Sequence, residues 1–389
     1  MDLGSEVYSV VKVWLSVFAA LGYCYAIGKI GPRGGPRRLV AVLPVVGLFL
    51  VLPLGLSSIH LGGSTAFFIA WLANFKLLLF AFGRGPLASD PSISLPRFTA
   101  LACLPIKIQP DPRADPSPGG ASRSQENADP IQNGRKKRDP PPQKPQKGHK
   151  SPVNYGIKIL LLAAMLRIYE YSDRLPQKVV WVLYSLHIYI CLEIILAAVA
   201  VVARAALGLE LEPQFNEPYL STSLQDFWGR RWNIMVTRIL RPTVYDPVLA
   251  LASRAVGRRY AALPAVLGTF VVSALMHELI FYYLGRVKPT GEITWFFLFH
   301  GLCLMAEIAA KKELKLGLRL PRPVAAVLTV GFVMVTAFWW FLPPLLRCRA
   351  DERAFEEYAA VGALVRDVVG RGLEFTLTGA LNASSLAKP

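Results

Sequence analysis

The chain has 389 residues, of which 53% are hydrophobic and only 18% are charged. The apolar residues occur in blocks long enough to cross a bilayer, which excludes a soluble protein built around one core. The formal net charge of +17 does not indicate a nucleic-acid partner, because the basic residues are distributed in the gaps between the apolar blocks.

Eight apolar segments are candidate transmembrane helices. In chain order they cover residues 10–26, 39–56, 65–82, 157–171, 179–202, 261–284, 293–310 and 324–346. The fourth segment is short and contains Arg167 and Glu170, which makes it the least typical span of the set. No strand-like alternation is visible, so the sequence predicts an all-α, polytopic membrane protein with about eight transmembrane helices.

Every second connection between these segments is basic. Examples are Arg37 and Arg38, the run 135–138, and the pair Lys311 and Lys312. The positive-inside rule places these connections in the cytosol and both termini outside. Residues 1–6 contain no basic residue, so the first span is predicted to remain as an anchor and not to be cleaved as a signal peptide.

A polar segment divides the chain. Residues 105–152 are rich in Pro, Gly, Lys, Asp and Gln, which predicts a disordered cytosolic insert. It separates an N-terminal three-span region, 1–104, from a five-span region, 153–346, that carries the candidate chemistry, and a C-terminal tail, 347–389, follows. The basic run in the insert resembles a nuclear-localisation patch, but in a polytopic protein it indicates a contact with anionic lipid or a solvated linker.

The cysteines indicate no framework of cross-links. Five are present, they are scattered, and none forms a C-x-x-C pair. The sequence therefore predicts neither a disulfide scaffold nor a zinc site, and no metal ligand is assigned.

His277 stands out, because it lies next to Glu278 inside the apolar segment 261–284. Moving an ionisable side chain into hydrocarbon costs about 3 kcal/mol on insertion scales, so such a pair is a candidate functional site. The alternative is a histidine that hydrogen-bonds a neighbouring helix. A second candidate region is the cytosolic connection 203–260, whose many aromatic residues favour amphipathic helices that pack on the membrane surface or dip into the bundle.

Three motifs from these regions occur together. They are Phe227-Trp228 followed by Trp232-Asn233-Ile234, then Ser273-Ala274 with His277-Glu278, and Phe299-His300-Gly301. The first two motifs resemble the membrane-bound O-acyltransferase superfamily. The fuller strings 226–233 and 238–248, together with Phe299-His300-Gly301, look most like its plant wax synthase branch, the long-chain-alcohol O-fatty-acyltransferases. The specific resemblance covers residues 219–310, and the polar insert is a departure outside the motifs.

The resemblance implies that His277 is the catalytic base and that Asn233 is the second polar residue of the centre. Esterifying an alcohol with an acyl thioester needs a base for the hydroxyl proton and a donor for the developing oxyanion. A neutral histidine and an asparagine amide can supply these. The sequence has no G-x-S-x-G elbow and no H-x-x-x-D signature, so direct transfer without a covalent acyl-enzyme is expected.

The remaining candidates are expected to bind substrate. Arginine is suited to the phosphates of coenzyme A, although ordinary positive-inside charge is an equally good explanation for any one of them. The tryptophans are expected chiefly as packing anchors, and His300 as an interhelical polar contact on the same helical face as Cys303 and Glu307. The candidate substrate-binding residues are Trp228, Arg230, Arg231, Trp232, Arg238, Ser273, Glu278 and His300.

The sequence therefore predicts a multi-pass enzyme of the endoplasmic reticulum membrane that transfers a fatty acyl group from acyl-CoA, its co-substrate, to a lipid hydroxyl without a further cofactor. A long-chain alcohol is the leading acceptor, giving a wax ester, and a sterol is the close alternative. A non-enzymatic transporter or channel would use His277, Glu278, His300 and Glu307 as a polar pathway, but the chain shows no repeated half. Acyl-chain preference and oligomeric state do not follow from the sequence.

Overall fold

The computed structural model describes residues 3–31, 34–106, 152–209, 211–313 and 320–386. Over these ranges the chain is built of helices, with one isolated antiparallel bridge between Ile106 and Leu211. Seven of the described helices are long and apolar enough to cross a membrane. The predicted all-α membrane fold is confirmed, whereas the predicted insert lies almost entirely outside the described residues and the region boundaries remain predictions.

The helices follow the predicted spans in chain order. The seven membrane-length segments are α1 (Leu3–Ile30), α2 (Pro36–Val51) with η1 (Leu52–Gly55), the continuous run α3 (His60–Ala66), η2 (Phe67–Ala73) and α4 (Asn74–Ala81), then α7 (Gln177–Leu207), α11 (Ala262–Gly285), α12 (Glu292–Glu313) and α13 (Arg322–Trp340). The other elements are α5 (Leu95–Cys103), α6 (Pro152–Tyr169), η3 (Ser172–Arg174), η4 (Pro218–Leu220), α8 (Leu224–Asp226), η5 (Phe227–Arg231), α9 (Ile234–Leu240), η6 (Arg241–Tyr245), α10 (Asp246–Ala255), α14 (Leu342–Arg347) and α15 (Ala350–Leu386).

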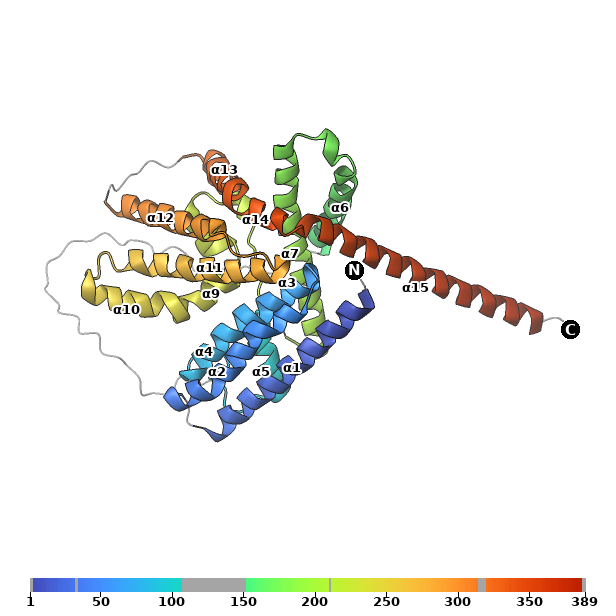
Figure 1. The fold of residues 1–389 in the computed structure, drawn as a ribbon, viewed down its shortest axis with the longest axis horizontal. Helices are drawn as coiled ribbons and strands as arrows, with labels where there is room; N and C mark the ends of the chain where they lie inside the picture. Colours follow the sequence, from blue (N-terminus) through green and yellow to red (C-terminus); the bar gives the residue numbers. More distant parts are fainter. Residues whose placement is uncertain (1–2, 32–33, 107–151, 210, 314–319, 387–389) are drawn as a thin grey trace, which may run out of the picture.

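The expected span at residues 157–171 is helix α6, which has 18 residues and is not among the seven. It packs against α7 as a helical hairpin (Figure 1). A helix at this place was predicted correctly, and its crossing of the membrane stays a prediction. Figure 1 also shows α1, α2 and α4 lying together, α11 beside α12, and α15 projecting away from the body.

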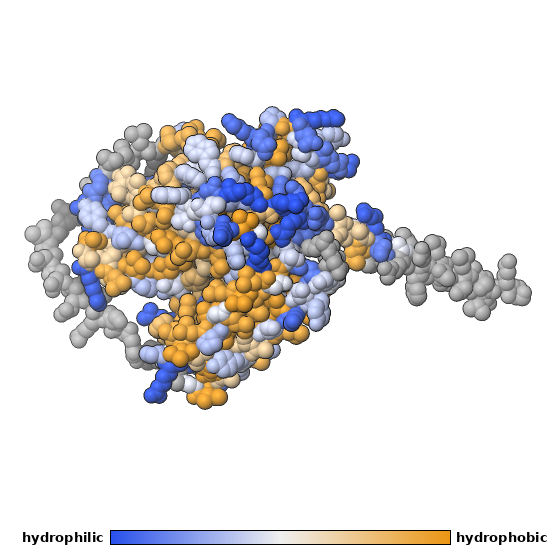
Figure 2. Space-filling model, in the orientation of Figure 1, coloured by the Kyte–Doolittle hydropathy of each residue, from blue (hydrophilic) through white to orange (hydrophobic). Residues whose placement is uncertain are grey.

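The run α3–η2–α4 is the central span. In it 78% of the apolar window is buried within the protein, against 33% or less in each of the other six spans. Its middle part, η2, is a π-helix, a geometry that occurs mostly as short insertions near functional sites. Hydrophobic residues cover much of the visible face of the surrounding helices (Figure 2), as expected where a protein contacts lipid.

Helices α11 and α12 approach each other closely because Gly301 of α12 faces Phe270 of α11. A Cβ atom at Gly301 would lie 3.0 Å from the Cβ atom of Phe270. Small residues at such crossings let membrane helices pack backbone to backbone. The contact brings Phe297, one turn before Gly301, against the ring of His277.

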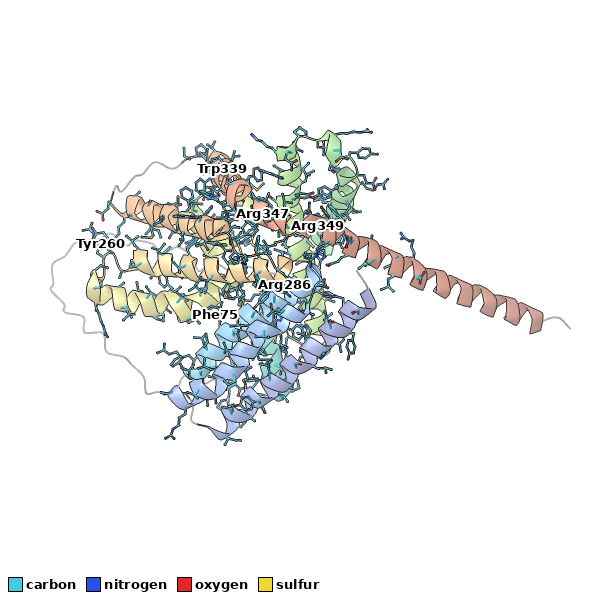
Figure 3. The ribbon with its side chains drawn as sticks, in the orientation of Figure 1. Phe75, Tyr260, Arg286, Trp339, Arg347 and Arg349 are labelled. Atoms are coloured by element: carbon cyan, nitrogen blue, oxygen red, sulfur yellow. The ribbon has the colours of Figure 1, made fainter. Side chains whose placement is uncertain are left out.

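Tyr260 and Arg286 mark the two ends of α11 (Figure 3). Arg347 and Arg349 lie at the Arg286 end, and all three of these arginines are engaged by oxygen atoms. Their respective partners are the carbonyls of Pro53 and Leu54, the carboxylate of Glu292, and the carboxylate of Glu352. Two of these three positive charges are therefore paired with carboxylates, and the third is held by backbone carbonyls.

Candidate active site

His277 lies on α11, and its ring lines a cavity of about 290 Å³ whose other walls are mostly aromatic and aliphatic. Three aromatic rings surround it: Trp71 edge-on at 5.0 Å between ring centroids, Phe297 at 4.2 Å and Phe341 at 6.2 Å. These contacts fix the plane of the imidazole and leave it facing an apolar space. A base in such a space meets a substrate hydroxyl with little competition from water.

The proton on His277 is placed by Ser273. Its Nδ1 atom lies 2.8 Å from the backbone carbonyl oxygen of Ser273, one turn earlier on α11. A carbonyl oxygen only accepts hydrogen bonds, so Nδ1 carries the hydrogen, and in the neutral ring Nε2 carries the lone pair. Within the described part of the chain no group donates to Nε2. The Ser273 backbone thus selects the tautomer that can act as a base.

Asn233 lines the same cavity as His277. It stands between η5 and α9 with φ 42° and ψ 61°, the left-handed region that asparagine tolerates better than most residues. The chain is fixed on both sides of it, because Ile234 N–H donates to the Gln214 carbonyl and Asn216 N–H donates to the Arg231 carbonyl, each at 2.9 Å. The two residues expected to form the centre therefore come from segments that are distant in the sequence and meet at one cavity.

Glu278, the neighbour of His277 in the sequence, faces another way. Its Oε1 accepts hydrogen bonds from the backbone N–H of Thr294, at 3.0 Å, and from its hydroxyl, at 2.9 Å. A carboxylate is favourable there, because the first turn of α12 presents unpaired N–H groups. Glu278 is not among the described residues that line the cavity of His277. Its expected contact with substrate therefore stays a prediction.

Trp228 and His300 form a linked pair that is not among the described residues lining the cavity. The Trp228 indole N–H donates to His300 Nδ1 at 3.2 Å, and His300 Nε2 lies 2.8 Å from the Thr336 hydroxyl. His300 is fully buried and bridges to α13, whereas Glu307 instead accepts from the backbone N–H of Leu224. The pair therefore links α12, α13 and the loop that carries Trp228.

Residues 211–299 match the model of the membrane bound O-acyl transferase family. The chain is 49% identical over 367 residues to acyl-CoA–sterol O-acyltransferase 1 of Arabidopsis thaliana. The aligned residues cover 92% of this chain and 97% of the relative. The chain belongs to the membrane bound O-acyl transferase family. It is also 47% identical over 358 residues to the long-chain-alcohol O-fatty-acyltransferase of Simmondsia chinensis (92% and 95% covered), and 43% identical over 355 residues to probable long-chain-alcohol O-fatty-acyltransferase 3 of Arabidopsis thaliana (90% and 94% covered).

Membership confirms the resemblance inferred from the motifs and makes this chain an acyltransferase. The family match contains both Asn233 and His277. It also covers α11, which carries His277, and the first turns of α12, where Phe297 packs on the His277 ring.

The arginines of this acyltransferase differ in their availability. Arg231 donates to the Asp226 carboxylate at 2.7 Å and Arg238 pairs with the Glu212 carboxylate. Arg230 is exposed and forms no ion pair within the described ranges. Of the three arginines expected to bind coenzyme A, Arg231 and Arg238 are therefore engaged in ion pairs within the protein. Arg230 is available to bind a phosphate.

Trp232 stacks on Phe227, with ring centroids 5.5 Å apart and planes 13° from parallel, and packs edge-on against Phe215 at 5.0 Å. These ring contacts hold Trp232, the residue next to Asn233, in place.

Trp71 is a contact of His277 that the sequence did not single out as a site residue. It lies among other apolar residues of its span, and no local pattern distinguishes it from them. Only the pairing of distant helices reveals it.

Proposed function

We propose that this acyltransferase transfers a fatty acyl group from acyl-CoA to the hydroxyl of a long-chain alcohol, forming a wax ester in the endoplasmic reticulum membrane. The observation that carries the proposal is the free Nε2 of His277 at an apolar cavity that Asn233 also lines. The relative from Simmondsia chinensis is named for this acceptor. Acyl-CoA is the co-substrate, and the proposed reaction uses no further cofactor.

The reaction follows from these two side chains. The alcohol donates its O–H to His277 Nε2, and the oxygen attacks the thioester carbonyl carbon as the proton moves to the ring. The oxyanion that forms accepts a hydrogen bond from the Asn233 amide. As the carbon–sulfur bond breaks, the imidazolium returns the proton to the coenzyme A sulfur. The proton and the electron pairs balance, and the ester forms without an acyl-enzyme.

Substrate approach follows from the charges. Arg230 is placed on the predicted cytosolic side, where it can contact a phosphate of coenzyme A. The predominantly apolar cavity suits a hydrocarbon chain. The alcohol is expected to enter from the bilayer, since its own tail partitions there.

A sterol is the second candidate acceptor, because the Arabidopsis relative at 49% identity is named a sterol acyltransferase. Microsomes that contain this chain are supplied with labelled acyl-CoA and either a long-chain alcohol or a sterol, and the labelled ester is measured. The proposal is supported if the wild type forms labelled wax ester and the His277→Ala variant does not. If the wild type forms labelled steryl ester alone, the acceptor is a sterol and not a long-chain alcohol.

A further inference from the structure

The proposed reaction places a positive charge on His277 for part of each cycle. The ring accepts the alcohol proton at Nε2 while Nδ1 keeps its own, so the imidazole is charged until the proton passes to the coenzyme A sulfur. This charge forms at a cavity whose walls are mostly apolar. A charge is costly in such surroundings, so the groups that contact the ring influence the rate.

No carboxylate balances this charge among the described residues. His277 forms no ion pair there, and its Nδ1 donates to the neutral carbonyl oxygen of Ser273. The carboxylate of Glu278 accepts from α12 instead. Asp351 lines the same cavity, but its carboxylate accepts from the Tyr184 hydroxyl at 3.1 Å. Stabilisation of the charged ring must therefore come from other groups.

Phe297 stacks its ring on that of His277. The two ring centroids lie 4.2 Å apart, and the planes are 32° from parallel. Trp71 and Phe341, in contrast, cross the imidazole plane at 87° and 66°. Of the three rings around His277, Phe297 is therefore the one that meets it face to face.

The face of a phenyl ring carries partial negative charge, whereas its edge is positive. A cation over the face, within about 6 Å of the centroid, is attracted to it, and the attraction is strongest where water is excluded. A neutral imidazole gains much less from the same contact. The stacking therefore stabilises the protonated ring more than the resting ring, which is the condition for raising kcat.

Phe297 is held by neighbouring rings and has no wall of the cavity. It is 3% exposed and packs against Trp228, at 5.9 Å between centroids, and edge-on against Phe296, at 5.2 Å. It is not among the described residues that line the cavity of His277. Its influence on the reaction therefore passes through the histidine.

We propose that Phe297 is a positioning residue whose ring face stabilises the protonated form of His277 during acyl transfer. The ring takes the part that a buried carboxylate has in a Ser-His-Asp triad, where the carboxylate stabilises the imidazolium. The proposal rests on the proposed function, because it requires His277 to take the proton. It applies equally to a long-chain alcohol and to a sterol as the acceptor.

Fluorinated phenylalanines in place of Phe297 test the charge of the ring face and leave its shape nearly constant. Fluorine is close to hydrogen in size, and each added fluorine withdraws electron density from the face. The full-length chain is prepared with 4-fluoro-, 3,5-difluoro- or 3,4,5-trifluorophenylalanine at this place. Ester formation per unit of membrane-inserted protein is then measured with labelled acyl-CoA.

The kcat should fall stepwise with the number of fluorines, about fivefold to tenfold in total, as expected for the loss of most of a cation–π contact shielded from water. Phe297→Leu, which keeps an apolar side chain without a π face, should lower kcat about tenfold to thirtyfold. The KM values for acyl-CoA and for the acceptor should not change. A rise in KM at constant kcat would place Phe297 in substrate binding and overturn the proposal.

Phe296 is the matched control. It precedes Phe297 on α12, is 4% exposed, and stacks at 4.4 Å on His300, which the proposed reaction leaves neutral. The same fluorinated residues in place of Phe296 should leave kcat unchanged. An equal decline in both series would reveal a general effect on packing and overturn the proposal.

His277→Ala separates this proposal from the proposed function. Substantial turnover by that variant would show that another group takes the proton, which removes the proposed mechanism and the role of Phe297 together. If the variant is inactive and kcat stays constant across the Phe297 series, the mechanism is retained and this proposal alone is overturned. Wax ester and steryl ester serve equally as the measured product, so a sterol acceptor leaves the test intact.

Discussion

His277 Nδ1 donates to the carbonyl oxygen of Ser273 across 2.8 Å, so the orientation of the candidate base is set by the helix that carries it. The contact depends on backbone, and a substitution of the serine side chain leaves it in place. The ring therefore enters the cavity with its proton already positioned, and only Nε2 is open to chemistry.

Replacing His277 should remove activity and leave the fold. His277→Ala is expected to lower acyl transfer by about 10² to 10⁴, the usual contribution of a general base. His277→Asn should be equally inactive although it can keep the bond to Ser273, because it has no atom in the place of Nε2. Labelled-ester formation per unit of membrane-inserted protein checks both. Substantial turnover by either well-expressed variant would remove His277 from the mechanism.

Asn233 allows its backbone role to be separated from its side-chain role. Asn233→Ala places a residue that disfavours left-handed backbone at φ 42°, whereas Asn233→Gly accepts that conformation readily. Both should lower kcat severely if the amide stabilises the oxyanion, by about 10² or more. Restoration of activity in the glycine variant alone would show that Asn233 serves only the turn.

Arg230→Ala should raise the KM for acyl-CoA about fivefold to thirtyfold, since one charge-assisted contact near water is worth about 1 to 2 kcal/mol. Its kcat should change little. Arg238→Ala is the comparison, because it leaves the Glu212 carboxylate without its ion pair and should reduce the yield of folded protein. Steady-state kinetics in microsomes distinguishes them, and a fall in kcat for Arg230→Ala at constant KM would contradict a binding role.

Inserted glycosylation sites test the membrane orientation. Ala359 lies exposed on α15, beyond the end where Arg286, Arg347 and Arg349 are engaged by oxygen atoms. A sequon placed there should be glycosylated, and one placed within residues 105–152 should not, because positive-inside charge puts the first in the lumen and the second in the cytosol. The opposite pattern would invert the protein and remove Arg230 from the side of cytosolic acyl-CoA.

Glu357 makes the attachment of α15 to α3 sensitive to acid. Burial acts to raise the pKa of this carboxyl, but hydrogen bonds from the His60 side chain and from the backbone of Ile59 and His60 outweigh it, and the pKa lies below the usual 4.5. The ionised form therefore stabilises the folded state fully above pH 4.5, and this contribution is lost as the pH falls through the lowered pKa. The stability difference between wild type and Glu357→Gln should shrink below pH 4.5 in thermal unfolding. A constant difference would argue against the ionised contact.

The helices were predictable from the sequence because a helix that contacts lipid needs a long, continuous stretch of apolar residues, and such a stretch can be identified without knowing the rest of the fold. The loop with Asn233 and the helix with His277 were recognisable from residue types at short spacing. The contacts of Trp71 with His277, and of His60 with His187 through Tyr358, were not, since they join segments with no common periodicity. The pairing of Arg238 with Glu212 is of the same kind. The sequence could predict candidates for phosphate binding, but only the packed helices show which arginine remains open.

The tautomer of His277 bears on how the catalytic cycle ends. Its Nε2 can only accept a hydrogen bond, and an alcohol has an O–H to offer, whereas an ester has none. The interaction that retains the acceptor is therefore destroyed by the reaction it undergoes. On the proposed chemistry, the ester is held only by apolar contacts that the bilayer can match. Product should therefore escape into lipid without a dedicated release step, and accumulated ester should inhibit the enzyme weakly.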